Sequence, residues 1–210
     1  MNRLRDRLPY RADDRGVSLV ELLVYSVLLV VVLALVGSMT YRTLVSQRDV
    51  RAVTEANNRA QLVAASVEAG VRSAAALKHT PLSGGDELLI ARTQTGAVDA
   101  ATWSCQEWYY DASTQTLYAK RVAESDATAP AIEEPTTVGD YSTWMVLSEG
   151  LTGPTPEAKI FAPSATTLPT TIHLGVQVAA GTREPVEIST LFTRRPQGAT
   201  QEGVGTPCFS

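Results

Sequence analysis

The sequence predicts an α+β fold in which a long N-terminal helix packs on an antiparallel β-sheet domain. An apolar run begins at Val17, no proline occurs between Pro9 and Pro81, and short β-like runs follow Pro81. Because proline breaks the interior of a helix, the proline-free stretch has room for one very long helix. The sequence thus divides into a charged leader at residues 1–16, an apolar helix segment at 17–39, an amphipathic helix segment at 40–78 and a β-rich domain at 79–210.

Length and composition limit the possible functions. The 210 residues suffice for one ordinary domain plus an appendage, and the net charge of -4 argues against a nucleic-acid partner. His79 and His173 lack the spacing of a metal site, and no P-loop, GxSxG or dinucleotide-binding motif occurs. We therefore expect a protein that is not an enzyme, with no catalytic residue, no metal and no cofactor.

Residues 1–16 form a charged leader with five arginines and three aspartates. From Val17 to Val36 the only strongly polar side chains are those of Ser18, Glu21 and Ser26. Twenty helical residues rise about 30 Å, which is the thickness of the hydrocarbon core of a membrane. The composition predicts a protein that crosses a membrane once. The basic leader places the N-terminal side in the cytoplasm and the C-terminal domain outside it.

Two commoner targeting signals compete with this interpretation. A secretory signal peptide has a shorter apolar core and a small-residue cleavage site after that core, and the run after Val17 has neither feature. A plain signal anchor fits the length and stays open. It leaves Glu21 unexplained, because an ionisable group in a spanning helix costs on the order of a few kcal/mol at mid-bilayer.

The residues around the start of the apolar run resemble the cleavage and methylation motif of type IV prepilins and type II secretion pseudopilins. In Arg15–Leu23, a basic residue and Gly16 are followed by four residues, then Glu21 and a continuing apolar run. The resemblance implies that a prepilin peptidase cuts after Gly16 and N-methylates Val17, the new N-terminus. Valine departs mildly from the phenylalanine or methionine that many family members have at this position.

Glu21 is the fifth residue of the mature chain that this resemblance implies. A carboxylate in lipid needs a partner, and the Val17 amino group of a neighbouring subunit can supply one. Such pairing would set the axial register of subunits in a filament, as buried polar groups do in coiled coils. The simpler alternative places Glu21 at the level of the lipid headgroups.

The resemblance implies a structural subunit that assembles through its N-terminal helix. The outer domain is longer than in a compact major pilin, so a minor pilin or a J-type pseudopilin is expected. The implied partners are other pilin subunits, the prepilin peptidase, an assembly platform with its ATPase, and membrane lipid before assembly. Before assembly the chain would be a single-pass protein of the cytoplasmic (inner) membrane, and after assembly it would lie in an extracellular pilus. The open alternatives are a type II secretion filament, a filament-borne binding or DNA-uptake module, and a monomeric anchored domain.

Beyond the membrane segment the helix becomes amphipathic and continues to about Leu77. Many major pilins have a kinking proline near this transition, whereas this chain has Gly37 and Ser38, so a kink there is an open question. Apolar residues recur every seven positions with a second set beside them, which favours packing on a sheet, and their small size predicts a close approach. They are Val53, Ala56, Ala60, Val63, Val67, Gly70, Ala74 and Leu77. The i,i+4 pairs on the polar side are Glu55–Arg59 and Glu68–Arg72.

After the helix the sequence predicts six strands separated by polar turns. Residues 112–115 and 180–183 each separate two predicted strands and therefore predict hairpins. Residues 123–140 predict a surface loop, and Ile160–Phe161 in the proline-rich segment 149–170 are expected to fill the core. The predicted strands are Asp86–Thr93, Gln106–Asp111, Thr116–Val122, Thr143–Leu147, Thr171–Ala179 and Val186–Thr193.

The two cysteines, Cys105 and Cys208, are too few and too far apart for a zinc site or a CxxC motif. The predicted topology places both outside the cytoplasm, where thiols oxidise, so we expect a Cys105–Cys208 disulfide that holds the C-terminal tail to the sheet. Many pilins close a C-terminal loop with cysteines in a similar way, although this loop would enclose nearly the whole outer domain. Two free thiols in a reducing setting are the alternative.

Overall fold

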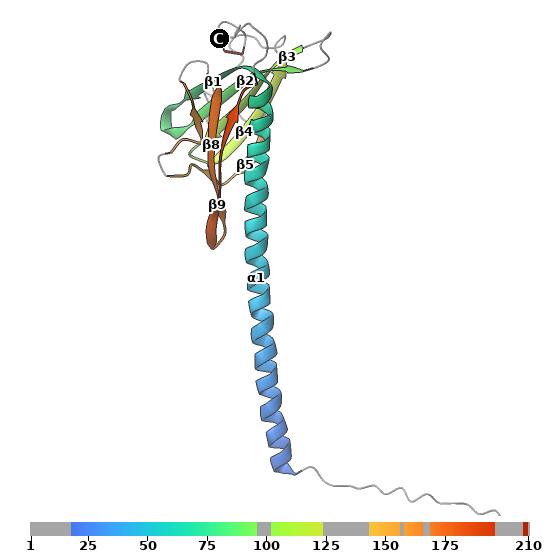
Figure 1. Cartoon of the computed structure of the whole chain (residues 1–210). Helices are drawn as coiled ribbons and strands as arrows, with labels where there is room; N and C mark the ends of the chain where they lie inside the picture. Colours follow the sequence, from blue (N-terminus) through green and yellow to red (C-terminus); the bar gives the residue numbers. More distant parts are fainter. Residues whose placement is uncertain are drawn as a thin grey trace, which may run out of the picture. The chain divides into compact units, whose positions relative to one another are not determined.

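The computed structural model describes residues 18–95, 102–123, 143–155, 158–165, 169–195 and 208–209. Within these ranges it confirms the α+β fold, with one long helix and two antiparallel sheets (Figure 1). The chain separates into two compact units, Met1–Gln47 and Arg48–Ser210. The elements are α1 (Leu19–Ser73), β1 (Ala74–Pro81), a 3-10 turn (Ser83–Gly85), β2 (Glu87–Thr95), β3 (Thr102–Asp111), β4 (Thr116–Ala123), β5 (Met145–Glu149), β6 (Leu151–Thr152), β7 (Phe161–Pro163), β8 (Thr171–Ala180) and β9 (Arg183–Thr193).

The helix passes through Gly37 and Ser38 but ends earlier than predicted. α1 stops at Ser73, and the residues expected to continue it to Leu77 belong to β1. The alanines in this stretch favour a helix, but antiparallel pairing of β1 with β2 outweighs that local preference. Ala74 and Leu77 are still buried, so the apolar positions were identified correctly while their secondary structure was not.

The first sheet has the strand order β1-β2-β3-β4-β5 and is antiparallel throughout. The predicted hairpin around residues 112–115 is confirmed, because Asp111 pairs with Thr116 across the turn. β3 begins at Thr102, so Cys105 lies inside this strand and not before it. Residues 124–140 of the predicted surface loop lie outside the described residues.

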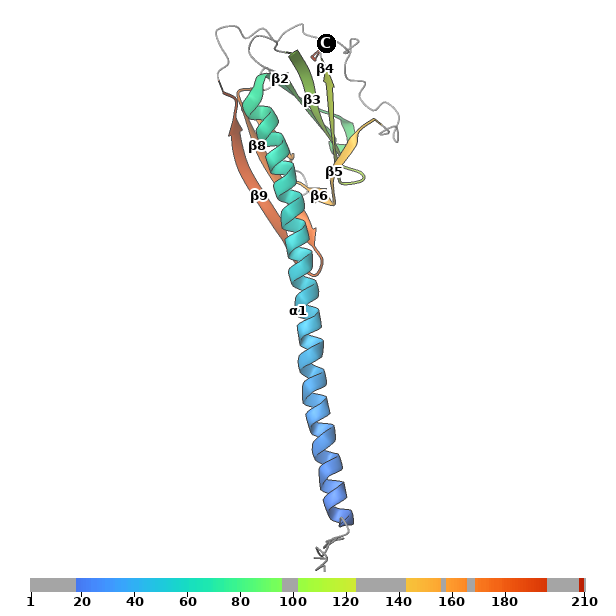
Figure 2. The same ribbon diagram turned by 90° about the vertical axis from the view of Figure 1, so that its right-hand side faces the viewer.

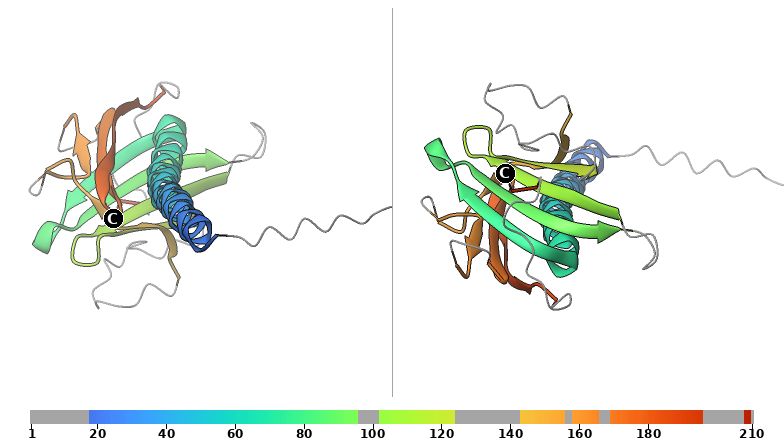
Figure 3. Two further views of the ribbon diagram at one scale, coloured as in Figure 1. Left: turned by 90° about the horizontal axis from the view of Figure 1, so that it is seen from below. Right: turned by 90° about the horizontal axis from the view of Figure 1, so that it is seen from above.

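The second sheet is centred on β8, which pairs with β6 and β7 along one edge and with β9 along the other. The predicted hairpin at residues 180–183 is confirmed by the pairing of Ala180 with Arg183. Alternate residues of β8 from Ile172 to Ala180 are buried, as the period of two in a half-buried strand requires. Figure 3 shows the two sheets as separate groups of strands, with β2 and β3 in green and β8 and β9 in orange.

The main core lies between the two sheets and the outer turns of α1, which are the turns from Ala56 to Val71. The predicted stripe of apolar helix residues, Val53 to Leu77, is buried from Ala56 onward, whereas Val53 is 38% exposed. Ile160 and Phe161 are buried in this core, as expected from the sequence. The buried residues of the helix are Ala56, Ala60, Val63, Val67, Gly70 and Val71.

A close helix-to-sheet contact joins Gly70 to Trp108. A Cβ atom added to Gly70 would lie 2.0 Å from Cη2 of Trp108, whereas packed carbon atoms lie about 3.5–4 Å apart. The indole nitrogen of Trp108 donates a hydrogen bond of 3.0 Å to Oγ of Ser66, which lies one helical turn before Gly70. The indole ring therefore occupies the space of the missing side chain, and its one polar group is paired.

A buried carboxylate joins the two sheets. Glu87, the first residue of β2, accepts hydrogen bonds from the backbone N–H groups of Ile160 at 2.6 Å and Phe161 at 3.1 Å. Nε2 of His79 lies 2.9 Å from the same carboxylate, and both side chains are buried. Glu87 thereby attaches the start of β7 to the first sheet.

The β8–β9 hairpin runs beside the outer turns of α1 (Figure 2). Its turn contains Gly181, which has a φ of 65° and faces Ala52 of the helix. Arg183 forms a salt bridge of 2.7 Å with Asp49. These contacts lie at the first residues of the second unit.

Gly70→Ala is expected to destabilise the second unit by about 2 kcal/mol, because the new methyl group overlaps the Trp108 ring and forces the helix and sheet apart. Thermal unfolding followed by near-UV circular dichroism measures the effect. Gly37→Ala is the matched control, since it makes the same change in the same helix where no atom lies within 4 Å. Equal unfolding temperatures for the two variants would contradict the close packing.

Candidate functional site

The apolar first part of α1 is the candidate functional surface. Every large apolar side chain from Leu19 to Val36 is exposed, with exposed fractions between 47% and 83%. The helix is apolar on all sides here, which is typical of a helix that lies in lipid or among other helices. Among the described residues, α1 is the one helix long and apolar enough to cross a membrane.

Glu21 lies in the first turn of this helix, where a negative charge is favoured by the helix dipole. Its Oε1 accepts a hydrogen bond of 3.0 Å from the hydroxyl of Tyr25, one turn further along. A carboxylate has about four acceptor positions, so this bond leaves capacity for a cation. The predicted processing residues, Gly16 and Val17, lie outside the described residues.

The predicted disulfide is confirmed. Cys105 and Cys208 are bonded, with their Cα atoms 5.5 Å apart and 103 residues apart in sequence. Both are buried in a second apolar cluster, on the face of the first sheet that points away from the helix. The cluster consists of Leu88, Ile90, Cys105, Tyr109, Tyr118 and Cys208, with Leu82, Trp144 and Phe209 packed against it.

A buried glutamate beside this cluster was not anticipated from the sequence. Glu107 is fully buried, and within the described part of the chain neither of its carboxylate oxygens has a hydrogen-bond partner. Burial raises the pKa of Glu107 to about 7, and the positive charge of Lys120 opposes that rise. The alternation of side chains along β3 places Glu107 on the same face as Cys105 and Tyr109, and this signal could have identified it.

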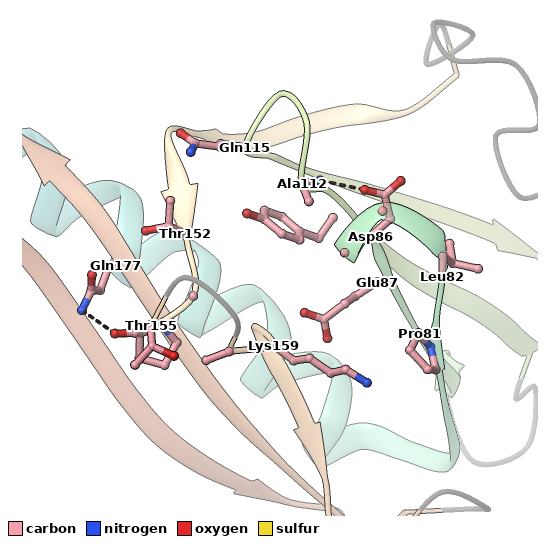
Figure 4. A pocket seen from close by; sticks show the side chains of 16 residues that line it. Pro81, Leu82, Asp86, Glu87, Ala112, Gln115, Thr152, Thr155, Lys159 and Gln177 are labelled. Carbon is pink, nitrogen blue, oxygen red and sulfur yellow. Dashed lines mark hydrogen bonds between the residues drawn. The ribbon is translucent and has the colours of Figure 1, made fainter.

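A cavity of about 530 Å³ opens between the two sheets (Figure 4). One wall contains Asp86, which accepts hydrogen bonds from the Tyr109 hydroxyl at 2.7 Å and from the Ala112 N–H at 2.8 Å. Burial, together with the nearby carboxylates of Glu87, Asp111 and Asp86, raises the pKa of Tyr110, whose hydroxyl donates to the carbonyl of Leu151. The acidic groups of this wall therefore already serve as acceptors for protein donors.

The remaining polar candidates have structural partners. Asp111 accepts hydrogen bonds from Ser113 and from the Thr114 N–H, which closes the β3–β4 turn. Nε2 of His173 lies 3.0 Å from the Ser189 hydroxyl. No cluster of metal-ligating side chains occurs among the residues that the structure describes.

The chain combines three features: an exposed apolar N-terminal helix segment, a later part of the same helix packed on antiparallel sheets, and a disulfide near the C-terminus. The architecture is pilin-like. No family model, curated protein or solved structure matches the chain.

Replacing Cys105 and Cys208 together by serine is expected to lower the free energy of unfolding by about 4–5 kcal/mol. The physical reason is that the bond closes a loop of 103 residues and so restricts the unfolded chain. Urea unfolding of the oxidised chain and of the double variant, monitored by circular dichroism, measures the difference. A change below about 1 kcal/mol would show that the bond carries little of the stability of the outer unit.

Proposed function

We propose that this chain is a non-enzymatic structural subunit, of the minor class, in a type IV pilus-like filament. It is cut after Gly16, N-methylated at Val17 and incorporated through the apolar first part of α1. The observation that carries the proposal is the position of Glu21, a single carboxylate in an exposed apolar helix segment and five residues beyond Gly16.

The exposed surface of the helix supports this assignment. A lipid bilayer covers such a helix before assembly, and a bundle of equivalent helices covers it in a filament. The second unit has its own core, formed by α1 from Ala56 onward and both sheets. The residues from Leu19 to Val36 are not needed for that core and can be used wholly for contacts with lipid or other subunits.

The charge of Glu21 supports pairing with a neighbouring subunit. An ionised carboxylate in lipid is costly unless it is paired and hydrogen-bonded. The Tyr25 hydroxyl supplies one hydrogen bond but no positive charge. Cleavage after Gly16 creates an amino group at Val17, and N-methylation keeps its positive charge while adding apolar surface. The pairing of this group with Glu21 of the next subunit fixes the axial position of each helix.

The partners follow from this role. They are the prepilin peptidase, other pilin subunits, an assembly platform with its ATPase, and lipid of the cytoplasmic membrane before assembly. After removal of residues 1–16 the chain has 13 basic and 19 acidic residues, a net charge of -6, which does not favour nucleic acid as a ligand.

The N-terminus of the mature protein tests the proposal directly. Mass spectrometry of the chain purified from membranes is expected to show N-methylated Val17 as the first residue. Gly16→Ala is expected to block cleavage, because the cut follows this glycine in the family that the motif resembles. An intact Met1 terminus in the wild-type chain would refute the proposed processing and with it the filament role.

Glu21→Ala is expected to leave cleavage unchanged but to reduce incorporation into filaments at least tenfold, because the Val17 amino group loses its partner. Immunoblotting of sheared filaments against the membrane fraction measures incorporation. Tyr25→Phe is the matched control: it removes the hydroxyl that contacts Glu21 but keeps the carboxylate, so incorporation should stay near the wild-type level. Normal incorporation of Glu21→Ala would exclude the pairing role.

A further inference from the structure

Glu107 lies in a row of side chains that crosses the outer face of the first sheet. Strand register places Lys78 opposite Ile90, Ile90 opposite Glu107, and Glu107 opposite Lys120. Directly opposed residues of antiparallel strands have Cβ atoms about 4.5–5.5 Å apart, so the side chain of Lys120 lies beside that of Glu107, whose pKa its charge lowers. The row therefore has a lysine at each end, with Ile90 and the buried acid between them.

The row is covered by the C-terminal turn, Cys208–Phe209, and by Trp144. Trp144 and Phe209 pack against the apolar cluster beside Glu107, and the disulfide cysteines, which belong to that cluster, are fully buried. Each lysine of the row holds one part of this cover. Nζ of Lys78 donates a hydrogen bond of 3.1 Å to the carbonyl of Phe209, and Nζ of Lys120 lies 5.5 Å from the centroid of the Trp144 ring.

Among the described residues, the other ionisable groups on this face have contacts of their own. Arg92 on β2 lies 4.0 Å from the centroid of the Trp103 ring. The Tyr109 hydroxyl donates to Asp86, at the edge of the same face, and Tyr118 packs against Tyr109. Lys120 and Lys78 are therefore the cations placed to respond to a charge on Glu107.

We propose that Glu107 is a proton-sensitive latch for the cover formed by Cys208, Phe209 and Trp144. When the carboxyl group is protonated, it is neutral and the cover stays closed over it. When it ionises, the result is a buried charge that has no hydrogen-bond donor among the described residues, which is costly. The carboxylate then attracts Lys120 from Trp144 and Lys78 from Phe209, so the cover loses both lysine contacts, keeps its disulfide to Cys105, and admits water to the charge.

The direction of the pH effect follows from proton linkage. The closed state keeps its proton up to about pH 7, whereas a solvated carboxyl group loses it near its ordinary pKa of 4.5. The closed state thus binds more protons than the open state between these values. Closure is fully favoured below about pH 4.5, weakens as the pH rises, and has lost its proton-linked contribution above about pH 7.

The rate at which a water-soluble phosphine, tris(2-carboxyethyl)phosphine, reduces the buried Cys105–Cys208 disulfide reports opening of the cover. The rates are measured from pH 4.5 to 8.5 on the full chain in detergent micelles, and each wild-type rate is divided by that of Glu107→Gln at the same pH. This ratio removes the pH dependence of the phosphine itself. We expect the ratio to rise by up to about tenfold per pH unit and to level off near pH 7.

Glu149→Gln is the matched control, because Glu149 is an exposed glutamate on β5 of the same sheet and its replacement should reproduce the wild-type profile. Amide exchange in β8 distinguishes local opening from general unfolding, and it should not follow the reduction rate. A flat ratio, or β8 exchange that rises in step with reduction, would overturn the latch.

A measurement on the wild-type chain tests the same proposal if Glu107→Gln does not fold. Carbon-13 NMR of the Glu107 carboxyl group is expected to show titration near pH 7, together with shifts of the Trp144 and Phe209 signals at the same pH. Titration near 4.5, or titration near 7 without a change at Trp144 and Phe209, would contradict it.

Discussion

The contact of Trp108 with Gly70 is the constraint on which the outer unit depends. The indole ring fills a space that no side chain of α1 can share, and its nitrogen is held by Ser66. This contact sets how closely helix and sheet approach, and small or short side chains line the rest of the helix stripe for the same reason. The residues that continue the stripe, Ala74 and Leu77, can then change to a strand while they remain in the same core.

Three glutamates show how the surroundings of one side-chain type decide its role. Glu87 is buried but accepts two backbone N–H groups and contacts His79, so it joins the two sheets. Glu107 is equally buried but lacks donors among the described residues, so burial raises its pKa toward neutrality. Glu21 is exposed in an apolar segment, where its partner must come from outside the chain or from its own helix. The first joins the two sheets, whereas the second and the third have the proton-sensitive role and the assembly role that we propose.

Much of the fold could be predicted because the spacing of apolar residues indicates which side of a helix or strand faces the core. The stripe from Ala56 to Gly70, both hairpins, and the positions of Ile160 and Phe161 followed from spacing and turn residues. The end of the helix could not be predicted, because Ala74–Leu77 has helical propensity and only pairing with a distant strand overrides it. The donors around Glu87 could not be predicted either, because Ile160 and Phe161 follow it at distances of 73 and 74 positions along the chain.

The two units place opposite demands on the sequence. The second unit must exclude water from its core, and it does so with α1 residues that begin only at Ala56, near the Asp49–Arg183 salt bridge. The first unit has no core of its own in its described helix, because every large apolar side chain from Leu19 to Val36 is exposed. Such a surface is stable only when lipid or other helices cover it. The feature that would make the first unit unsuited to water is the one that a membrane or a bundle of helices accommodates. In the proposed filament, Glu21, the one acidic residue from Leu19 to Val36, would supply the register that apolar contacts alone do not specify.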